Sequence, residues 1–507
     1  MSKFHSTLSR RDFVKALGLS GAGLGLASAA APAFHDLDEL MPSADNKVSH
    51  PWWVKQREHG NPTIEVDWNM LTPSHSIKTG MEGFGYPSPY PGYLTHEDAL
   101  TNPSKMDQTK PGYRMEDYAL FIASMQRGLF DHSIDETVGP PSLAPQIWNA
   151  DPTPDAWPDW GNPGTPKFKK VPRWSGTPEE ASRMITAAAH YFGAYKVGFL
   201  EVDDKVKKLT FADSTKWADC DEPYATGEVI PRGFGLGFPA PVHVFPNKMK
   251  YVIVLQVTQP HDTMRILGDP AQPGHMQPIN GSSFALGYNQ RLTLLIRMQA
   301  FLKVLGYLHS ESVWCYNTGG GALAGINEIG RHGIGISPEL GSAYRVNLGI
   351  FTDLPVVPTP PIDGGMTKFC ETCGVCADLC PNEAINKDKE PTWDIFPTKL
   401  GRPEYGIPAG TPNTWSRPGV KNWHVDYVRC RGCSYCQGYC VFSQQNFASM
   451  HNIIKSTISN TTLLNKFFAD SDRLFGYSDV DTDYDGWWNR DSSSSVSTLN
   501  YARLLGR

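Results

Sequence analysis

The sequence lacks a long apolar run after its first 34 residues, and it lacks a surplus of basic residues. Lysine and arginine total 46 against 52 acidic residues, which gives a net charge of -6 at pH 7. No later segment approaches the ~20 consecutive apolar residues of a membrane-spanning helix, so membrane attachment would require a partner. A mildly acidic chain without a basic patch argues against nucleic acid as a partner. The 507 residues are enough for two or three domains with buried cores.

The N-terminus has the pattern of an export signal. Segment 9–15 contains the pair Arg10-Arg11, and a Gly/Ala-rich apolar stretch follows it to residue 34. This pattern predicts a twin-arginine signal at 1–33, with cleavage after Ala31 or Ala33. The twin-arginine route exports proteins already folded around a cofactor, so the signal also predicts a cofactor loaded in the cytoplasm. The alternative is an amphipathic N-terminal helix of a cytosolic protein.

Eight of the ten cysteines form two runs with the same spacing, C-x2-C-x2-C-x3-C. The runs are Cys370, Cys373, Cys376 and Cys380, then Cys430, Cys433, Cys436 and Cys440. In two-cluster ferredoxins with this spacing, the fourth cysteine of each run binds the other cluster. We therefore expect one 4Fe-4S cluster on Cys370, Cys373, Cys376 and Cys440, and a second on Cys430, Cys433, Cys436 and Cys380. Zinc ribbons and disulfides are the alternatives, and two identical four-cysteine runs disfavour both.

The middle of the chain predicts an α+β domain. Thr177-Pro178-Glu179-Glu180 is a capping box that opens a predicted helix to about Phe192. Strands are predicted at 197–202 and 251–257, and a later helix with one apolar face ends at Gly306.

Two other segments are rich in proline and aromatic residues. Residues 34–172 predict short helices and irregular segments. Residues 387–425, between the cysteine runs, predict an inserted surface loop.

Together these features resemble the reductive dehalogenases of organohalide-respiring bacteria. The resemblance lies in the leader, AHYFGAYKVGFLE at 189–201, strand 251–257, NEIGRHG at 327–333, the segment 345–355 ending in TDLP, and the two cysteine runs in that order. It implies an α+β architecture, with a nitroreductase-like corrinoid-binding domain followed by a bacterial two-cluster ferredoxin-like domain. The implied order is a signal peptide at 1–33, a variable region at 34–172, the corrinoid-binding catalytic domain at 173–355, the ferredoxin-like domain at 356–450 and a C-terminal extension at 451–507.

The resemblance also implies a function. The family replaces halogen by hydrogen on a halogenated hydrocarbon, using a Co(I) corrinoid supplied with electrons by two 4Fe-4S clusters, as terminal reductase of organohalide respiration. The implied cobalamin is base-off, and the sequence has no Asp-x-His-x-x-Gly loop that would supply an axial histidine. The expected partners are a halogenated small-molecule substrate, a small integral-membrane anchor protein and a respiratory electron donor. The expected location is the outer face of the cytoplasmic membrane, with peripheral attachment.

Three catalytic residues follow from the same resemblance. Tyr288 matches the proton donor, Arg345 the basic residue that stabilises its phenolate, and Asn317 a polar residue that orients the substrate halogen. The chemistry suits the pair, because a neighbouring guanidinium favours the ionised form of a phenol. Without the resemblance, Tyr288 would be taken for a half-buried aromatic residue with a bonded hydroxyl. Arg331 is expected to be structural or to contact the corrin, and no corrinoid-binding residue is assigned.

Two other function classes fit part of the sequence. One is an exported electron-transfer subunit with no chemistry of its own, and the other is a corrinoid enzyme similar to epoxyqueuosine reductase. The export signal and the acidic charge argue against a transfer-RNA substrate. Asp481-x-Asp483-x-Asp485-Gly486 is interpreted as a solvated acidic segment, Gly233-x-Gly235-x-Gly237 as a turn, and Cys220 and Cys315 as packed thiols.

Overall fold

The computed structural model describes residues 48–73, 173–230, 240–266, 277–311, 316–395, 417–426, 429–430, 432–443, 449–474 and 484–488. These residues combine helices and strands, as the sequence predicts. The predicted signal peptide, most of the region 34–172, the glycine turn at 233–237, Cys315 and the acidic residues 481–483 lie outside the described residues.

A four-stranded antiparallel sheet forms the centre of the fold, in the order β2-β6-β10-β7. Its strands are β2 (Lys196–Glu201), β6 (Tyr251–Thr258), β10 (Tyr344–Thr352) and β7 (His309–Glu311). The two strands expected from the sequence, 197–202 and 251–257, are thus confirmed within a residue. The inner strand β6 is buried over nearly its whole length, which explains its continuous apolar sequence.

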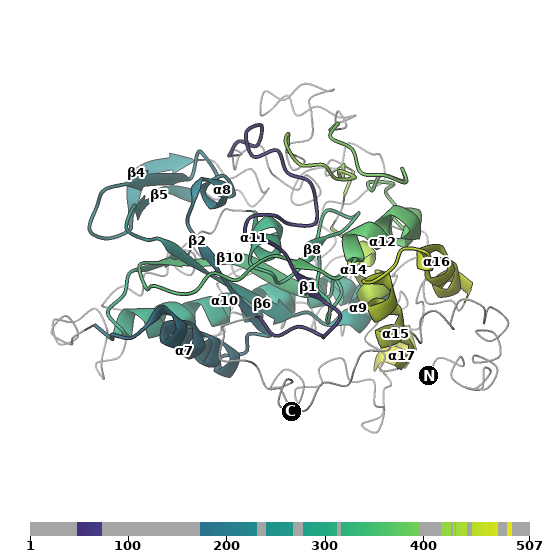
Figure 1. Ribbon diagram of the computed structural model, residues 1–507, viewed down its shortest axis with the longest axis horizontal. Helices are drawn as coiled ribbons and strands as arrows, with labels where there is room; N and C mark the ends of the chain where they lie inside the picture. Colours follow the sequence, from purple (N-terminus) through teal and green to yellow (C-terminus); the bar gives the residue numbers. More distant parts are fainter. Residues whose placement is uncertain are drawn as a thin grey trace, which may run out of the picture.

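Helices cover both faces of this sheet (Figure 1). On one face α7 (Pro178–Tyr191) and the long α10 (Pro278–Val304) pack against residues such as Phe199, Ile253 and Leu255. On the other face, α11 (Asn317–Leu323) packs against Val252, Val254 and Val346. Residues 252 and 254 face α11, and residues 253 and 255 face α7 and α10, because successive side chains of a strand point to opposite faces of the sheet. Residues on α10 and on α11 are therefore separated by the sheet.

The capping box at the start of α7 is formed as expected. The Thr177 hydroxyl accepts from the Glu180 backbone N–H at 3.2 Å, and the Glu180 carboxylate accepts from the Thr177 N–H at 2.8 Å. Thr177→Ala removes the first bond and should lower the free energy of unfolding by about 1 kcal/mol. Chemical denaturation measures this loss, and Thr177→Ser, which keeps the acceptor, should retain most of the stability. Equal losses in the two variants would contradict the role of the hydroxyl.

Gly349 produces an irregularity in β10, where the register with β6 shifts between Asn347 and Ile350. Its φ is +99°, and a Cβ atom there would lie 1.6 Å from the Ile253 carbonyl oxygen. Only glycine fits this close approach of two backbones. The shift sets the register of the first half of β10, in which Arg345 lies opposite Val257.

Smaller elements surround the central sheet. A three-stranded sheet contains β3 (Thr215–Ala218), β5 (Ala240–Pro246) and β4 (Tyr224–Ile230), next to α8 (Asp204–Lys207). Two-stranded sheets pair β1 (Lys55–Gln56) with β11 (Ile362–Asp363), and β8 (Glu328–Ile329) with β9 (Gly335–Ile336). The remaining elements are α9 (His261–Arg265), α12 (Met366–Cys373), α13 (Val375–Asp378), α14 (Tyr435–Gly438), η7 (Val441–Ser443), α15 (Ser449–Ile458), α16 (Asn465–Leu474) and α17 (Tyr484–Trp488). Figure 1 shows α12 and α14 to α17 gathered at one end of the molecule.

The predicted surface loop 387–425 is exposed at 387–390, as expected, but most residues of its C-terminal end, 417–425, are buried. Thr392 pairs with Asn422 and Ile385 with Val425, as isolated bridges. Trp423 is fully buried, and its indole N–H donates to the Asp388 carbonyl at 3.0 Å. Composition suggested exposure, but the tertiary fold places this tryptophan against the cysteine helices. Residues 396–416 lie outside the described residues.

A buried ion pair fastens the segment 48–73 to the core. Lys196 Nζ lies 2.5 Å from Glu339 Oε1 and 2.7 Å from the Ser49 carbonyl oxygen. Burial alone would raise the pKa of Glu339, but the Lys196 charge and hydrogen bonds outweigh it and lower the pKa to about 2. Glu339 is therefore ionised at neutral pH and compensates the buried ammonium group.

Glu339→Gln should lower the free energy of unfolding by about 3 to 5 kcal/mol, because it leaves the Lys196 ammonium buried without a counter-charge. A matched control is Glu228→Gln, which breaks the exposed 2.6 Å pair with Lys216. The control should cost less than about 1 kcal/mol. Denaturation of both variants measures the difference, and a loss at Glu339 as small as the control would refute this role.

The longest helix of the structure, α10, has 27 residues. In the described part of the chain, neither this helix nor any other is long and apolar enough to cross a membrane.

Candidate functional site

The two cysteine runs share one backbone turn, which follows the second cysteine of each run. Gly374, between Cys373 and α13, has φ +68°, and Ser434, between Cys433 and α14, has φ +65°. Both left-handed residues begin a short helix whose first turn places the third cysteine of the run. A serine tolerates this conformation at some cost, so its presence indicates that the turn is required by the surrounding structure.

The cysteines gather in two groups, in the partition that their spacing predicts. One small cavity is lined by Cys370, Cys373, Cys376 and Cys440. In the second group, Cys433 interacts with Cys380 and Cys430, and Cys436 with all three. The groups are adjacent, because Cys376 also interacts with Cys436.

The donor set of each group suits a polynuclear metal site. Burial and then repulsion by Cys440 raise the pKa of Cys370 to about 12, and burial likewise raises the pKa of Cys376 and Cys436 well above the usual thiol value. Several buried thiolates require a compensating cation, which metal coordination supplies. Among the described residues, no three His, Cys, Asp or Glu side chains are placed to hold a single metal ion. A 4Fe-4S cluster distributes its four thiolates over four irons, so wider spacing is expected.

Two residues of the segment 327–333 hold the first cysteine run in place. The buried Glu328 carboxylate accepts from the backbone N–H groups of Gly364 and Thr367, at the start of α12. Arg331 donates to the Cys370 carbonyl at 2.7 Å and to the Asn386 carbonyl at 2.9 Å. Its guanidinium also lies 4.7 Å from the centre of the Trp423 ring. Arg331 is therefore structural, one of the two roles expected for it.

The structure brings Tyr288 and Arg345 together. Tyr288 lies on α10 and Arg345 on β10, and the Arg345 guanidinium carbon is 5.0 Å from the centre of the Tyr288 ring. The same guanidinium lies 4.8 Å from the Phe284 ring. Burial lowers the pKa of Arg345, while Tyr288 and Cys436 act in the opposite direction. Arginine remains charged in proteins, so the pair places a cation against a phenol.

Sequence reasoning missed two neighbours of this pair. Arg291, three residues after Tyr288 on α10, is 4% exposed and places its guanidinium carbon 4.9 Å from the Tyr288 ring. Gln259, at the end of β6, is 3% exposed, and a Cβ on Gly287 would touch its side chain. The i+3 spacing from Tyr288 could have indicated Arg291, whereas no sequence signal indicated Gln259.

Asn317 is placed elsewhere. It begins α11, on the opposite face of the sheet from α10 and Tyr288. Tyr316, just before it, donates its N–H to the Leu209 carbonyl at 2.9 Å, near α8. The structure does not bring Asn317 together with the Tyr288–Arg345 pair, because the sheet separates the two helices.

Comparison with known proteins identifies the family of this chain. Residues 49–356 match the family model described as reductive dehalogenase subunit. The chain is also 31% identical to the chloroethene reductive dehalogenase of Dehalococcoides mccartyi (strain VS), over 97% of this chain and 98% of that protein. The chain belongs to the reductive dehalogenase family. The family expected from the sequence is therefore confirmed.

Other reductive dehalogenases match over most of this chain. A trichloroethene reductive dehalogenase from another strain of Dehalococcoides mccartyi is 27% identical over 96% of this chain and 97% of that protein. A solved structure described as suggesting a mechanism for B12-dependent dehalogenation has a TM-score of 0.54 and 15% identity, and the match covers 88% of this chain and 52% of that chain. This chain thus spans about half the length of that solved protein. At this identity the likeness shows a shared fold.

Proposed function

We propose that this chain replaces a halogen by hydrogen on a halogenated hydrocarbon, with a corrinoid and two 4Fe-4S clusters as cofactors. The observation on which this rests is the contact of Arg345 with Tyr288 beside the second cysteine run. Relatives named for chloroethene and trichloroethene support a small chlorinated alkene as the first substrate to test. Of the expected catalytic residues, Tyr288 and Arg345 are retained, and Asn317 is not.

The polar atoms near Tyr288 suit a ligand that has many amide groups. Both polar side-chain atoms of Gln259, its Nε2 and Oε1, are buried and make no hydrogen bond within the described residues. The same holds for the Nε atoms of Arg345 and Arg291. Buried polar atoms in native proteins normally have partners. The peripheral amides of a corrinoid both donate and accept, so Gln259, Arg291 and Arg345 would hold them. When bound, the corrinoid supplies the reduced metal centre that breaks the carbon–halogen bond.

The two cysteine groups would hold the clusters that conduct electrons to the site. The crossed arrangement of Cys440 with the first run and Cys380 with the second is that of a two-cluster ferredoxin. We accordingly propose that residues 173–355 form a nitroreductase-like domain and that residues 356–450 form a ferredoxin-like domain. The matching turns at Gly374 and Ser434 support the second part of this proposal.

Replacing halogen by hydrogen consumes two electrons and one proton and releases halide. In the proposed reaction, the Tyr288 hydroxyl gives its proton to the carbon that loses the halogen. Arg345 stabilises the phenolate that remains, and Phe284, 4.6 Å from Tyr288 between ring centres, helps to exclude water. The guanidinium is partly buried, and its Nε atom is shielded from solvent, which weakens the screening of its charge.

The cellular setting is part of the proposal. The twin-arginine leader supports export to the outer face of the cytoplasmic membrane, where the protein would serve as terminal reductase of organohalide respiration. A small integral-membrane protein would anchor it there, and a respiratory donor would supply electrons.

The first experiment is metal analysis of anaerobically purified protein, combined with a reduced-viologen assay on chlorinated ethenes, chlorinated aromatic compounds and brominated compounds. About eight iron and one cobalt per chain with halide release would support the proposal. About eight iron and no cobalt, even after reconstitution with corrinoid, would instead point to an electron-transfer subunit.

A further inference from the structure

Gln437 links the second cysteine run to the Tyr288–Arg345 pair. It follows Cys436 directly in α14, and its side chain is 3% exposed. Its amide oxygen accepts from Arg345 Nη1 at 3.3 Å, and its amide nitrogen donates to the Ser342 carbonyl at 2.9 Å. Arginine can only donate and a carbonyl can only accept, so these partners permit one orientation of the amide.

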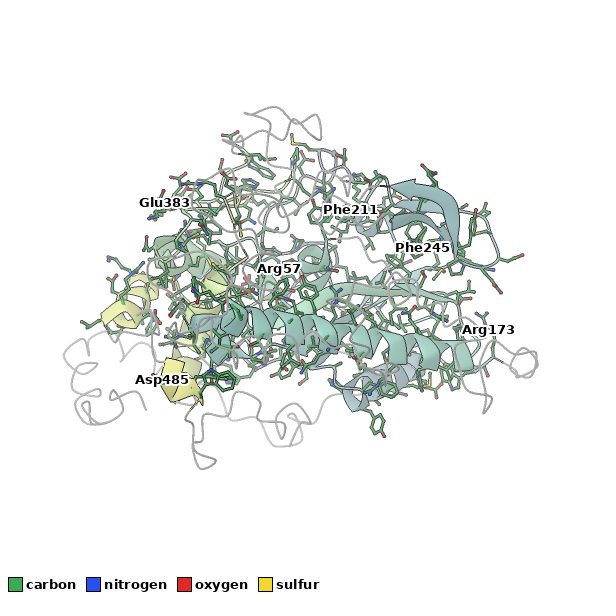
Figure 2. All side chains as sticks on the ribbon, turned by 180° about the vertical axis from the view of Figure 1, so that it is seen from behind. Arg57, Arg173, Phe211, Phe245, Glu383 and Asp485 are labelled. Atoms are coloured by element: carbon green, nitrogen blue, oxygen red, sulfur yellow. The ribbon has the colours of Figure 1, made fainter. Side chains whose placement is uncertain are left out.

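The Arg345 guanidinium is held between two parts of the fold. On the α10 side it lies against the Phe284 and Tyr288 rings, and a Cβ on Gly287 would come within 3.1 Å of its Cγ atom. On the α14 side it donates to Gln437. Figure 2, seen from behind, shows α10 running along the molecule toward the cysteine-bearing end, with Arg173 labelled at its opposite end.

Among the described residues, no carboxylate forms an ion pair with this guanidinium. Its hydrogen bonds within the described residues go to two neutral oxygens, the amide oxygen of Gln437 and the Tyr344 carbonyl. Tyr288 and Cys436 both interact electrostatically with it. Because the guanidinium is partly buried, solvent screens its charge only in part, and one positive charge therefore acts on the phenol and on the cysteine group at once.

We propose that Gln437 is a positioning residue that holds Arg345 between Tyr288 and the cluster bound through Cys436, so that one guanidinium acts on both the proton donor and the electron donor. This inference rests on the proposed function. Its consequence is a coupling between two properties that are otherwise independent. The positive charge of Arg345 raises the reduction potential of that cluster, and the same charge stabilises the Tyr288 phenolate.

The test is an EPR-monitored redox titration of the holoprotein, together with kcat and KM. Arg345→Gln should lower the midpoint potential of the Cys436-bound cluster and leave the other cluster unchanged. Gln437→Met keeps the length of the side chain but cannot hold Arg345. Gln437→Met should lower the midpoint potential of the Cys436-bound cluster, as Arg345→Gln does. It should also lower kcat by about ten- to a hundred-fold at nearly constant KM. The double variant should be no worse than Arg345→Gln alone, because the two residues act as one unit.

A matched control is Gln56→Met, the same change on the exposed strand β1. It should move neither midpoint nor kcat. Both cluster signals in the EPR spectrum show that each variant is folded and loaded. An unchanged midpoint and kcat in Gln437→Met, or additive losses in the double variant, would overturn the inference.

The midpoint potential is measured without substrate, so it does not depend on the proposed reaction. If Tyr288→Phe is inactive while Gln437→Met behaves as wild type, the inference fails and the proposed function stands. If Tyr288→Phe retains full activity, the assignment of the proton donor fails, whatever the potentials show.

Discussion

Tyr288→Phe is expected to lower kcat by about 10²- to 10⁴-fold, the usual contribution of a positioned proton donor. The variant removes the hydroxyl but keeps the ring, so the contacts with Phe284, Arg291 and Arg345 remain. Iron and cobalt content should therefore be unchanged. Halide release with reduced viologen as electron donor measures kcat, and metal analysis of the same preparation shows whether the cofactors are retained.

The segment that follows the same helix provides a matched control. Tyr307, just after α10, also has a guanidinium over its ring, from Arg173 at 4.3 Å, and its hydroxyl donates to the Trp174 carbonyl at 2.8 Å. Tyr307→Phe should lose about 1 kcal/mol of stability and almost no activity. If both variants keep kcat within a few-fold of wild type, Tyr288 is not the proton donor. If Tyr288→Phe and Tyr307→Phe lower kcat equally, the loss of activity is structural.

Cys440→Ser is expected to remove the cluster of the first run, although Cys440 belongs to the second run in sequence. The reason is the crossed arrangement, in which Cys440 lines the same cavity as Cys370 and Cys373. A serine is a poor ligand for this cluster, so iron should fall from about eight to about four per chain. Halide release should be abolished, because the proposed electron path is broken.

The crossed arrangement also predicts which of the two cluster EPR signals each cysteine variant loses. Cys440→Ser should lose the same EPR signal as Cys370→Ser, whereas Cys380→Ser should lose the other. If Cys440→Ser instead loses the signal that Cys433→Ser loses, the runs are not crossed. Cys220→Ser is the control, since this partly exposed thiol lies outside both groups and its removal should leave iron and activity unchanged.

Local patterns in the sequence predicted the elements correctly where the determining contacts are local. The capping box of α7 depends on residues three apart, and the strand β6 depends on a continuous apolar segment. The surface loop 387–425 was wrong at its C-terminal end because Trp423 is buried against α12, which is distant in the chain. Asn317 was expected beside Tyr288 and Arg345 but lies on the other face of the sheet, for a related reason. Its position in the sequence does not reveal which face of the sheet α11 will cover.

The sequence by itself indicated the family and the two cysteine runs, and it predicted the crossed partition of their thiols, because cluster ligation imposes a fixed spacing on neighbouring residues. It also indicated Tyr288 and Arg345, through resemblance. Only the tertiary structure decided that Gln437 holds Arg345, that Arg291 lies against Tyr288 and that Gln259 lies beside Gly287. These contacts join α10, β10, β6 and α14, and the packing of such distant segments depends on the register and faces of the whole sheet.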